Sequence, residues 1–394
     1  MHFNDEGDGD LFDSLATALP VSEKKHLQTI REAFTNPVIG ITGNLGKTTT
    51  LTMIEAILAS RGKVLRHPNG CGDVRNNLRT FKKLSMEYDY ALFELDYLRS
   101  KHFVDVLHLI RPTIGIVTNL GDAHLNYLDR MMKVALEKTS LLKYLEDDGI
   151  AILNKDDELS STIARHLNTQ QILFFGLNPH SDFYATHIEQ AGPMGMQFRL
   201  NDRFQLQLPI YSIQDLYNFL AAVACVFHLG FSLDEIVEIL QTRFTMPPGR
   251  GRVMRLGRHY IIDESYEGNP RSVSKAARVL TTFAPYSSQL VLVVGDMSHT
   301  GINVEQQHLN MGYFLSALPI NLLITVGEYA RFIGDGFKMI KTEGKHVFSV
   351  NSINEVIQLF ETHLQDESSV AIKGLGNVAM HRILSYFKKK ALED

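Results

Sequence analysis

Short apolar runs alternate with helical stretches from residue 37 onward, and this alternation restricts the possible folds more than any other feature of the chain. The first runs occupy residues 38–42, 90–95, 114–118, 150–153 and 172–175. Strands of this kind, each followed by a helix, form parallel sheets whose crossover helices cover both faces. The sequence therefore predicts an α/β fold with a parallel sheet in its first half.

A Pro- and Gly-rich segment, residues 246–252, interrupts the pattern and predicts a linker. Beyond it the alternation resumes, with apolar runs at residues 260–263, 290–294, 322–326 and 370–373. Between residues 182 and 213 alternating residues interrupted by glycine predict a small antiparallel patch. We expect a short helical lead over residues 1–36, a first α/β domain over 37–248 and a smaller, Rossmann-like α/β domain over 249–394.

The composition excludes several classes of protein. The chain carries 39 Lys and Arg against 44 Asp and Glu, so non-specific binding to nucleic acid or to an acidic membrane is not expected. Cys71 and Cys225 are its two cysteines, which leaves no disulfide framework and no metal–thiolate cluster. The acidic start lacks the order of a signal peptide, and no apolar run is long enough to span a bilayer. We expect a soluble cytoplasmic protein.

The strongest functional signal is the glycine-rich sequence at residues 40–50, Gly-Ile-Thr-Gly-Asn-Leu-Gly-Lys-Thr-Thr-Thr, which follows an apolar run and precedes a helical one. Glycines let backbone N–H groups approach phosphate oxygens, and the following helix N-terminus adds its positive dipole end. The lysine neutralises the β- and γ-phosphates and the first threonine ligates Mg²⁺. The strict P-loop spacing would place glycine where Ile41 stands. The predicted nucleotide-binding residues of this loop are Gly43, Asn44, Gly46, Lys47, Thr48 and Thr49.

Residues 41–50 resemble the ATP loop of the Mur ligases, which build the peptide of peptidoglycan, and further blocks follow in the family's order. Residues 69–77 resemble the loop between the first two strands of the ATPase domain. Residues 93–95 resemble the strand end that supplies a Mg²⁺-binding glutamate, here Glu94, and residues 118–125 the segment that supplies a metal-binding histidine, here His124. Lys138 lies where the family carries a lysine that forms a carbamate with CO₂. The resemblance implies that Thr48, Glu94, His124 and carbamylated Lys138 hold Mg²⁺, and that Lys47, His124 and Lys138 are the catalytic residues.

Further blocks resemble the parts of the family that hold the nucleoside. Residues 217–222 resemble the helix whose asparagine, here Asn218, binds adenine, although Gln214 stands where the family often has histidine. Arg252 matches the linker arginine. Residues 261–273 resemble a block that is closest to the D-alanyl-D-alanine-adding (MurF-type) branch. In that block the resemblance implies that Asp263 binds the ribose and that Asn269 faces the nucleotide.

The resemblance implies an ATP-dependent amide ligase that activates a carboxylate as an acyl phosphate, couples it to an amine and releases ADP and phosphate. Peptidoglycan ligases of the family begin with a UDP-binding domain of about a hundred residues, whereas about 36 residues precede the phosphate loop here. We therefore expect a carboxylate without a UDP group, and a second copy or a partner subunit in place of that domain. Two alternatives stay open: a true peptidoglycan D-alanyl-D-alanine-adding ligase, and a homologue that binds ATP without ligating.

Overall fold

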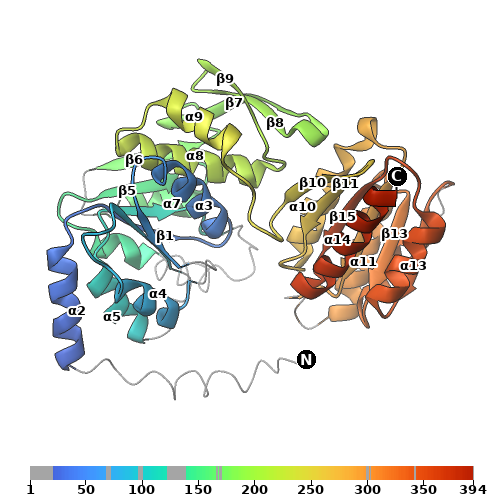
Figure 1. Ribbon diagram of the computed structural model, residues 1–394, viewed down its shortest axis with the longest axis horizontal. Helices are drawn as coiled ribbons and strands as arrows, with labels where there is room; N and C mark the ends of the chain where they lie inside the picture. The colour runs from blue at the N-terminus through green and yellow to red at the C-terminus, as the bar shows by residue number, and fades with distance from the viewer. Residues whose placement is uncertain are drawn as a thin grey trace. The chain divides into compact units, whose positions relative to one another are not determined.

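The computed structural model describes residues 21–67, 72–95, 101–121, 139–165, 167, 171–298, 301, 303–340 and 343–393. The chain forms two compact units (Figure 1). The first unit comprises residues 1–186, 199–205 and 214–244, and the second comprises residues 187–198, 206–213 and 245–394. The predicted division at residues 36, 248 and 249 stays a prediction. None of the described helices is long and apolar enough to cross a membrane.

A nine-stranded sheet in the order β2-β3-β1-β4-β5-β6-β7-β8-β9 begins with the phosphate-loop strand and its neighbours. Its strands from β2 to β7 pair in parallel, as the alternation of apolar and helical stretches predicts. Strand β1 is buried along its whole length, which explains its continuous apolar run. The strands are β1 (Val38–Thr42), β2 (Val64–Arg66), β3 (Tyr90–Glu94), β4 (Ile114–Val117), β5 (Ile150–Asn154), β6 (Ile172–Gly176), β7 (Phe183–Gln190), β8 (Met196–Leu200) and β9 (Phe204–Leu208).

The helices before residue 245 begin at side chains that satisfy their free N–H groups. Asp73 caps α4, Asp157 caps α7, and Ser232 with Glu235 forms a capping box at α9. One face of the sheet is covered by α2, α4 and α5, whose apolar side chains pack with those of β1, β2 and β3. The helices are α2 (Val21–Ala33), α3 (Lys47–Leu58), α4 (Val74–Phe81), α5 (Lys101–Ile110), η2 (Thr139–Tyr144), α7 (Glu158–Ala164), η3 (Gly192–Met194), α8 (Ile213–His228) and α9 (Leu233–Thr242).

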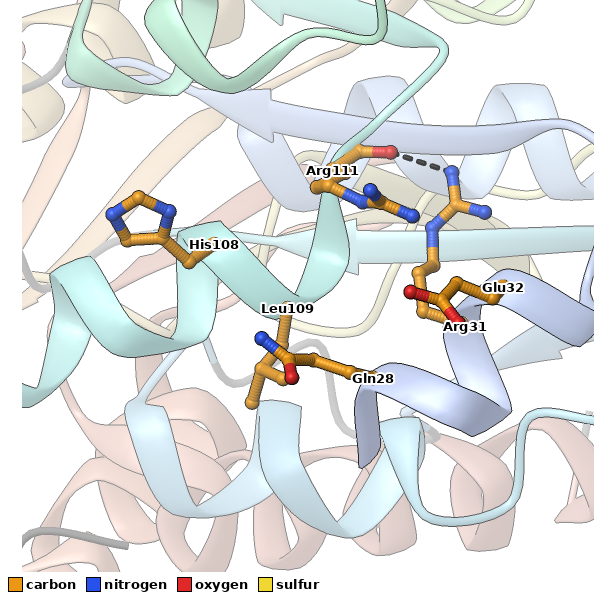
Figure 2. A pocket seen from close by; sticks show the side chains of 6 residues that line it. All are labelled: Gln28, Arg31, Glu32, His108, Leu109 and Arg111. Atoms are coloured by element: carbon orange, nitrogen blue, oxygen red, sulfur yellow. Dashed lines mark hydrogen bonds between the residues drawn. The ribbon is translucent and has the colours of Figure 1, made fainter. Parts of the chain in front are cut away.

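The predicted helical lead contains α2, which is fastened to the first unit by the buried side chain of Arg31. Its guanidinium donates to the carbonyl oxygens of Ile110 at 2.7 Å, Arg111 at 2.6 Å and Phe34 at 2.9 Å. It also pairs with Glu146 at 3.0 Å. Figure 2 shows Arg31 reaching from α2 to Arg111, just beyond the end of α5. Burial lowers the pKa of Arg31, against the opposing charge of Glu146. Because cations stabilise carbonyl groups at helix C-termini, Arg31 ties α2 to α5.

The second unit contains a six-stranded sheet in the order β10-β11-β15-β12-β13-β14. Alternate residues of its central strands face opposite sides: one side packs against α10, α11 and α12, the other against α13 and α14. Strand β10 is antiparallel to β11, and the other neighbours are parallel. The elements are β10 (Arg252–Leu256), β11 (His259–Glu264), α10 (Pro270–Thr281), η4 (Ala284–Tyr286), β12 (Leu290–Gly295), α11 (Val304–Ser316), β13 (Leu322–Val326), α12 (Ala330–Lys338), β14 (His346–Val350), α13 (Ile353–His363), β15 (Ser369–Lys373) and α14 (Gly376–Glu393).

Candidate active site

The phosphate loop connects the end of β1 to the start of α3. Gly43 has φ +141° and Gly46, the N-cap of α3, has φ +87°. A side chain at Gly43 would put its Cβ 2.0 Å from Thr118 Oγ1, and one at Gly46 would put its Cβ 2.0 Å from Asn218 Oδ1. Both positions therefore require glycine for backbone conformation and for space.

The segment after β4 holds the loop from the neighbouring strand. The N–H of Asn44 donates to the carbonyl of Asn119 at 2.9 Å, and the N–H of Leu45 donates to Asn119 Oδ1 at 3.1 Å. Thr118 Oγ1 donates to the carbonyl of Leu45 at 2.7 Å. The side chain of Asn44, a predicted nucleotide ligand, donates to the carbonyl of Leu120 at 2.7 Å. These bonds form the loop within the first unit without a nucleotide.

Lys47 and Thr48, the first residues of α3, are buried side by side. Lys47 Nζ donates to the carbonyl of Gly43 at 2.7 Å, so the ammonium curls back over the loop. Thr48 Oγ1 lies 3.0 Å from Glu94 Oε1 and 2.9 Å from Glu94 Oε2. Thr49 is buried behind them. The structure thus brings together a cation, a hydroxyl and a carboxylate at the carboxyl ends of β1 and β3, where open α/β sheets bind their ligands.

The donor set of Thr48 and Glu94 fits a hard divalent cation. Hydroxyl and carboxylate oxygens are the ligands that Mg²⁺ takes from proteins, usually alongside water and phosphate oxygens. Among the described residues no group of three or more His, Cys, Asp or Glu side chains converges on a possible metal position. The other two predicted ligands, His124 and Lys138, lie outside the described residues.

Asn77 is a residue of this site to which sequence reasoning assigned no role. Its side chain, buried in α4, donates to the backbone carbonyl of Glu94 at 2.9 Å and to that of Gly72 at 3.1 Å. These two bonds fix the end of β3 and thereby the direction of the Glu94 carboxylate. The block at residues 69–77 was the available signal, because it ends in two asparagines.

Asn218, the predicted adenine ligand, projects from α8 against the phosphate loop. Its Oδ1 accepts from Gln214 Nε2 at 3.2 Å and faces Gly46, as the 2.0 Å approach to a Cβ there demonstrates. Gln214 therefore bonds directly to the side chain that the resemblance assigns to adenine. Nearby on the same helix, Tyr217 donates its hydroxyl to Asp156 at 2.9 Å, and burial together with that carboxylate raises the pKa of Tyr217.

The second unit collects the three remaining predicted nucleotide residues at one end of its sheet. Asp263, at 4% exposure, accepts from the N–H of Gly249 at 2.8 Å and from Ser265 Oγ at 2.7 Å. Arg252 is exposed at the start of β10 and lies opposite Asp263 in the strand register. Asn269 caps α10 by accepting from the N–H of Ser272 at 2.9 Å. Sequence reasoning proposed Asp263 as a ribose ligand, whereas these bonds fasten the predicted linker to β11.

A buried charge cluster lies at the same end of this sheet, and sequence reasoning did not identify it. Lys373, 2% exposed, lies 3.4 Å from Glu264, its register partner on β11. Lys275 reaches the other oxygen of Glu264 at 2.7 Å. Burial lowers the pKa of Lys373, and Glu264 opposes that effect. Because such a pair must be complete to be tolerated in the interior, it fixes the register of β11 against β15.

The first unit has a phosphate-loop strand and helix, with its hydroxyl and lysine next to a carboxylate, and the second is a smaller α/β unit. This is the architecture of a P-loop ATPase domain followed by a C-terminal α/β domain. A family model described as "Mur ligase middle domain" matches residues 41–226. The UDP-N-acetylmuramoyl-tripeptide–D-alanyl-D-alanine ligase of Escherichia coli is 28% identical over 362 residues, which cover 90% of this chain and 77% of the relative.

Solved structures resemble the whole architecture. A crystal structure of MurF from Acinetobacter baumannii has a TM-score of 0.80 and 25% identity, covering 93% of this chain and 80% of that one. The MurF ligase from Thermotoga maritima in complex with ADP has a TM-score of 0.75 at 20% identity, covering 95% and 86% of the two chains, and supports the fold alone. The chain belongs to the Mur ligase family, and its relatives here are of the MurF type.

Proposed function

We propose that the chain is an ATP-dependent carbon–nitrogen ligase that activates a carboxylate as an acyl phosphate and couples it to an amine. The observation that carries this proposal is the contact of Thr48 Oγ1 with both oxygens of Glu94, beside the buried ammonium of Lys47. A phosphoryl-transfer site needs positive charge and a metal position next to a phosphate-binding loop. Family membership supports the same reaction class.

The roles proposed for the loop follow from charge and reach. The N–H groups at the start of α3 and the Lys47 ammonium bind the β- and γ-phosphates, which requires Lys47 to leave the carbonyl of Gly43. Mg²⁺, held by Thr48 and Glu94 with His124 and carbamylated Lys138, supplies charge neutralisation for phosphoryl transfer. The carbamate and the contribution of His124 are proposals from the family resemblance. No side chain has to act as a nucleophile, because positioning and charge neutralisation carry such a reaction.

The nucleoside roles are proposals of the same kind. Asn218 has its oxygen against Gln214 and Gly46, so its amide Nδ2 is left to donate to an acceptor nitrogen of adenine. For Asp263 to bind a ribose hydroxyl as well, it must share oxygens that already accept from Gly249 and Ser265. A carboxylate has about four acceptor positions, so this sharing is chemically possible. Arg252 and Asn269 keep their proposed contacts to ATP.

For the substrates, the relatives supply the first candidates to test. The E. coli relative is named for a UDP-linked tripeptide and D-alanyl-D-alanine. The expectation of a carboxylate without a UDP group receives no support from such relatives, so we propose the D-alanyl-D-alanine-adding reaction as the first to assay. A carboxylate that lacks UDP is the second, and light scattering on the active species tests the predicted second copy or partner subunit.

The deciding experiment measures ADP release by the full chain with Mg²⁺ and ATP. One arm supplies UDP-N-acetylmuramoyl-tripeptide and D-alanyl-D-alanine, and a second supplies the peptide acid without UDP. We expect ADP release that needs both the acid and the amine, and its loss in Lys47→Ala. Lys63→Ala, which removes an exposed lysine of the same unit, is the matched control and should retain activity. ATP binding without acid- and amine-dependent ADP release would favour a non-ligating homologue and contradict the proposal.

A further inference from the structure

His308 is a fully buried histidine of α11 that the proposed mechanism does not use. Its Nε2 accepts from the backbone N–H of Met297 at 2.8 Å, and its Nδ1 lies 2.7 Å from the carbonyl oxygen of Val304. An N–H donor on one side and a carbonyl on the other determine the tautomer. Only the neutral imidazole with its proton on Nδ1 satisfies both partners.

The residue that His308 holds belongs to a short loop at the carboxyl end of β12. Asp296, next to Met297, accepts from the N–H groups of Tyr329 at 2.9 Å and Ala330 at 2.6 Å, which start α12. A Cβ on Gly327 would lie 2.5 Å from Asp296 Oδ1. The loop is therefore fixed by two side-chain contacts, one from α11 and one to α12.

This loop also supports the loop that carries Asn269, one of the residues proposed to face the nucleotide. The N–H of Ser298 donates to the carbonyl of Gly268 at 3.2 Å. A Cβ on Gly268 would lie 3.0 Å from the carbonyl oxygen of Asp296 and 3.3 Å from the Cα of Gly374. The loops after β11, β12 and β15 thus meet in backbone contact. A shift of the β12 loop must move the neighbouring loops as well.

We propose that His308 is a positioning residue whose neutral imidazole holds the loop after β12 against the loop that carries Asn269, and that protonation of the imidazole releases this contact. A protonated Nε2 would present an N–H to the N–H of Met297, which removes the bond and leaves two donors facing each other. The consequence for ligation rests on the proposed function, whereas the loop contact itself does not.

The surroundings of His308 favour the neutral form. Burial lowers its pKa, and the bond to Val304 and the charge of Asp296 oppose that effect. Asp296 faces the imidazole from the β12 loop, and the ring of Tyr329, 6.0 Å away between centroids, faces it from the start of α12. The folded protein therefore takes up this proton less readily than the unfolded chain. Its contribution to stability is complete above pH 6.5, the ordinary value for histidine, and is lost as the pH falls through the lowered value.

Two substitutions separate the two bonds of the imidazole. In His308→Gln the side-chain oxygen reaches the position of Nε2 and accepts from Met297, while in His308→Asn the amide reaches only the position of Nδ1 and serves Val304. Amide hydrogen exchange on the full chain measures the loop directly. We expect the protection factor of a peptide over residues 295–298 to fall about tenfold in His308→Asn and less than about threefold in His308→Gln. In the unmodified chain it should fall between pH 7.5 and 5.5.

A peptide over β13, residues 322–326, reports whether the second unit remains folded. Equal loss in the two variants, no loss in either, or protection that is the same at both pH values would overturn the proposal. Should His308→Asn also expose β13, the pH series on the unmodified chain decides alone. Activity provides a second readout: we expect a lower kcat/KM on the acid side for the unmodified chain, with His308→Gln shifting that limb. Loop exchange that behaves as expected without any ligase activity would refute the proposed function but leave the role of His308 intact.

Discussion

Gly46→Ala is the substitution whose effect the structure defines most closely. Two separate costs arise at this position. The backbone has φ +87°, where an L side chain is strained by about 1–2 kcal/mol. The new Cβ would also lie 2.0 Å from Asn218 Oδ1 and 2.9 Å from its Cγ. Real Cβ contacts under 3.0 Å essentially never occur, so Asn218 must move by about 1 Å or more.

The chain contains a matched control for the first cost. Gly230 has φ +85°, and a Cβ there meets nothing within 4 Å. Gly230→Ala should therefore lose only the backbone part, about 1–2 kcal/mol. Because Asn218 is 2% exposed, it has little room to yield, and overpacking of this kind costs a further ~1–3 kcal/mol. Gly46→Ala should lose about 2–5 kcal/mol in total.

Urea unfolding followed by far-UV circular dichroism measures both losses, and binding of a fluorescent ATP analogue measures the loop itself. We expect Gly46→Ala to bind the analogue at least about tenfold more weakly, because the start of α3 has to move. Adding Asn218→Ala should return the overpacking part of the stability, which a double-mutant cycle isolates. If Gly46→Ala and Gly230→Ala lose the same stability, or if Asn218→Ala brings no relief, then Asn218 does not pack rigidly against the phosphate loop and the reasoning fails.

Three further predictions address the metal and the anchored helix. Thr48→Ala should raise the Mg²⁺ concentration needed for ADP release while Thr48→Ser, which keeps the hydroxyl, should not; equal requirements in a Mg²⁺ titration would contradict the Thr48–Glu94 site. Lys138→Ala should remove most ADP release, with partial rescue by added short-chain carboxylates, and full activity in that variant would refute the carbamate. Arg31→Met should lower the free energy of unfolding by about 2–4 kcal/mol, because it leaves buried carbonyl oxygens without donors, whereas the exposed Arg79→Met should change it by less than about 0.5 kcal/mol; similar urea midpoints would count against the proposed anchoring of α2.

Local pattern was sufficient for the buried parts of the fold. The predicted runs at residues 38–42, 90–95 and 114–118 correspond to strands β1, β3 and β4, because strands buried on both faces read as continuous apolar segments. The same reasoning did not reveal β2, β10 or β14. Strand β2 has three residues, and β10 and β14 are edge strands whose residues are partly exposed. An edge strand lacks a continuous apolar run, so its pattern resembles a loop, and β10 begins inside the segment predicted as a linker.

The site divides in the same way. Glycine, lysine and threonine at fixed spacing identify the phosphate loop from the sequence, since all of these residues act within one strand–turn–helix unit. Only the tertiary structure placed Asn218 against Gly46 and the amide of Asn77 on the carbonyl of Glu94. It likewise gave Asp263 its bond to Gly249. These contacts join residues far apart in the chain, and their existence depends on strand order and helix packing, which no local pattern encodes.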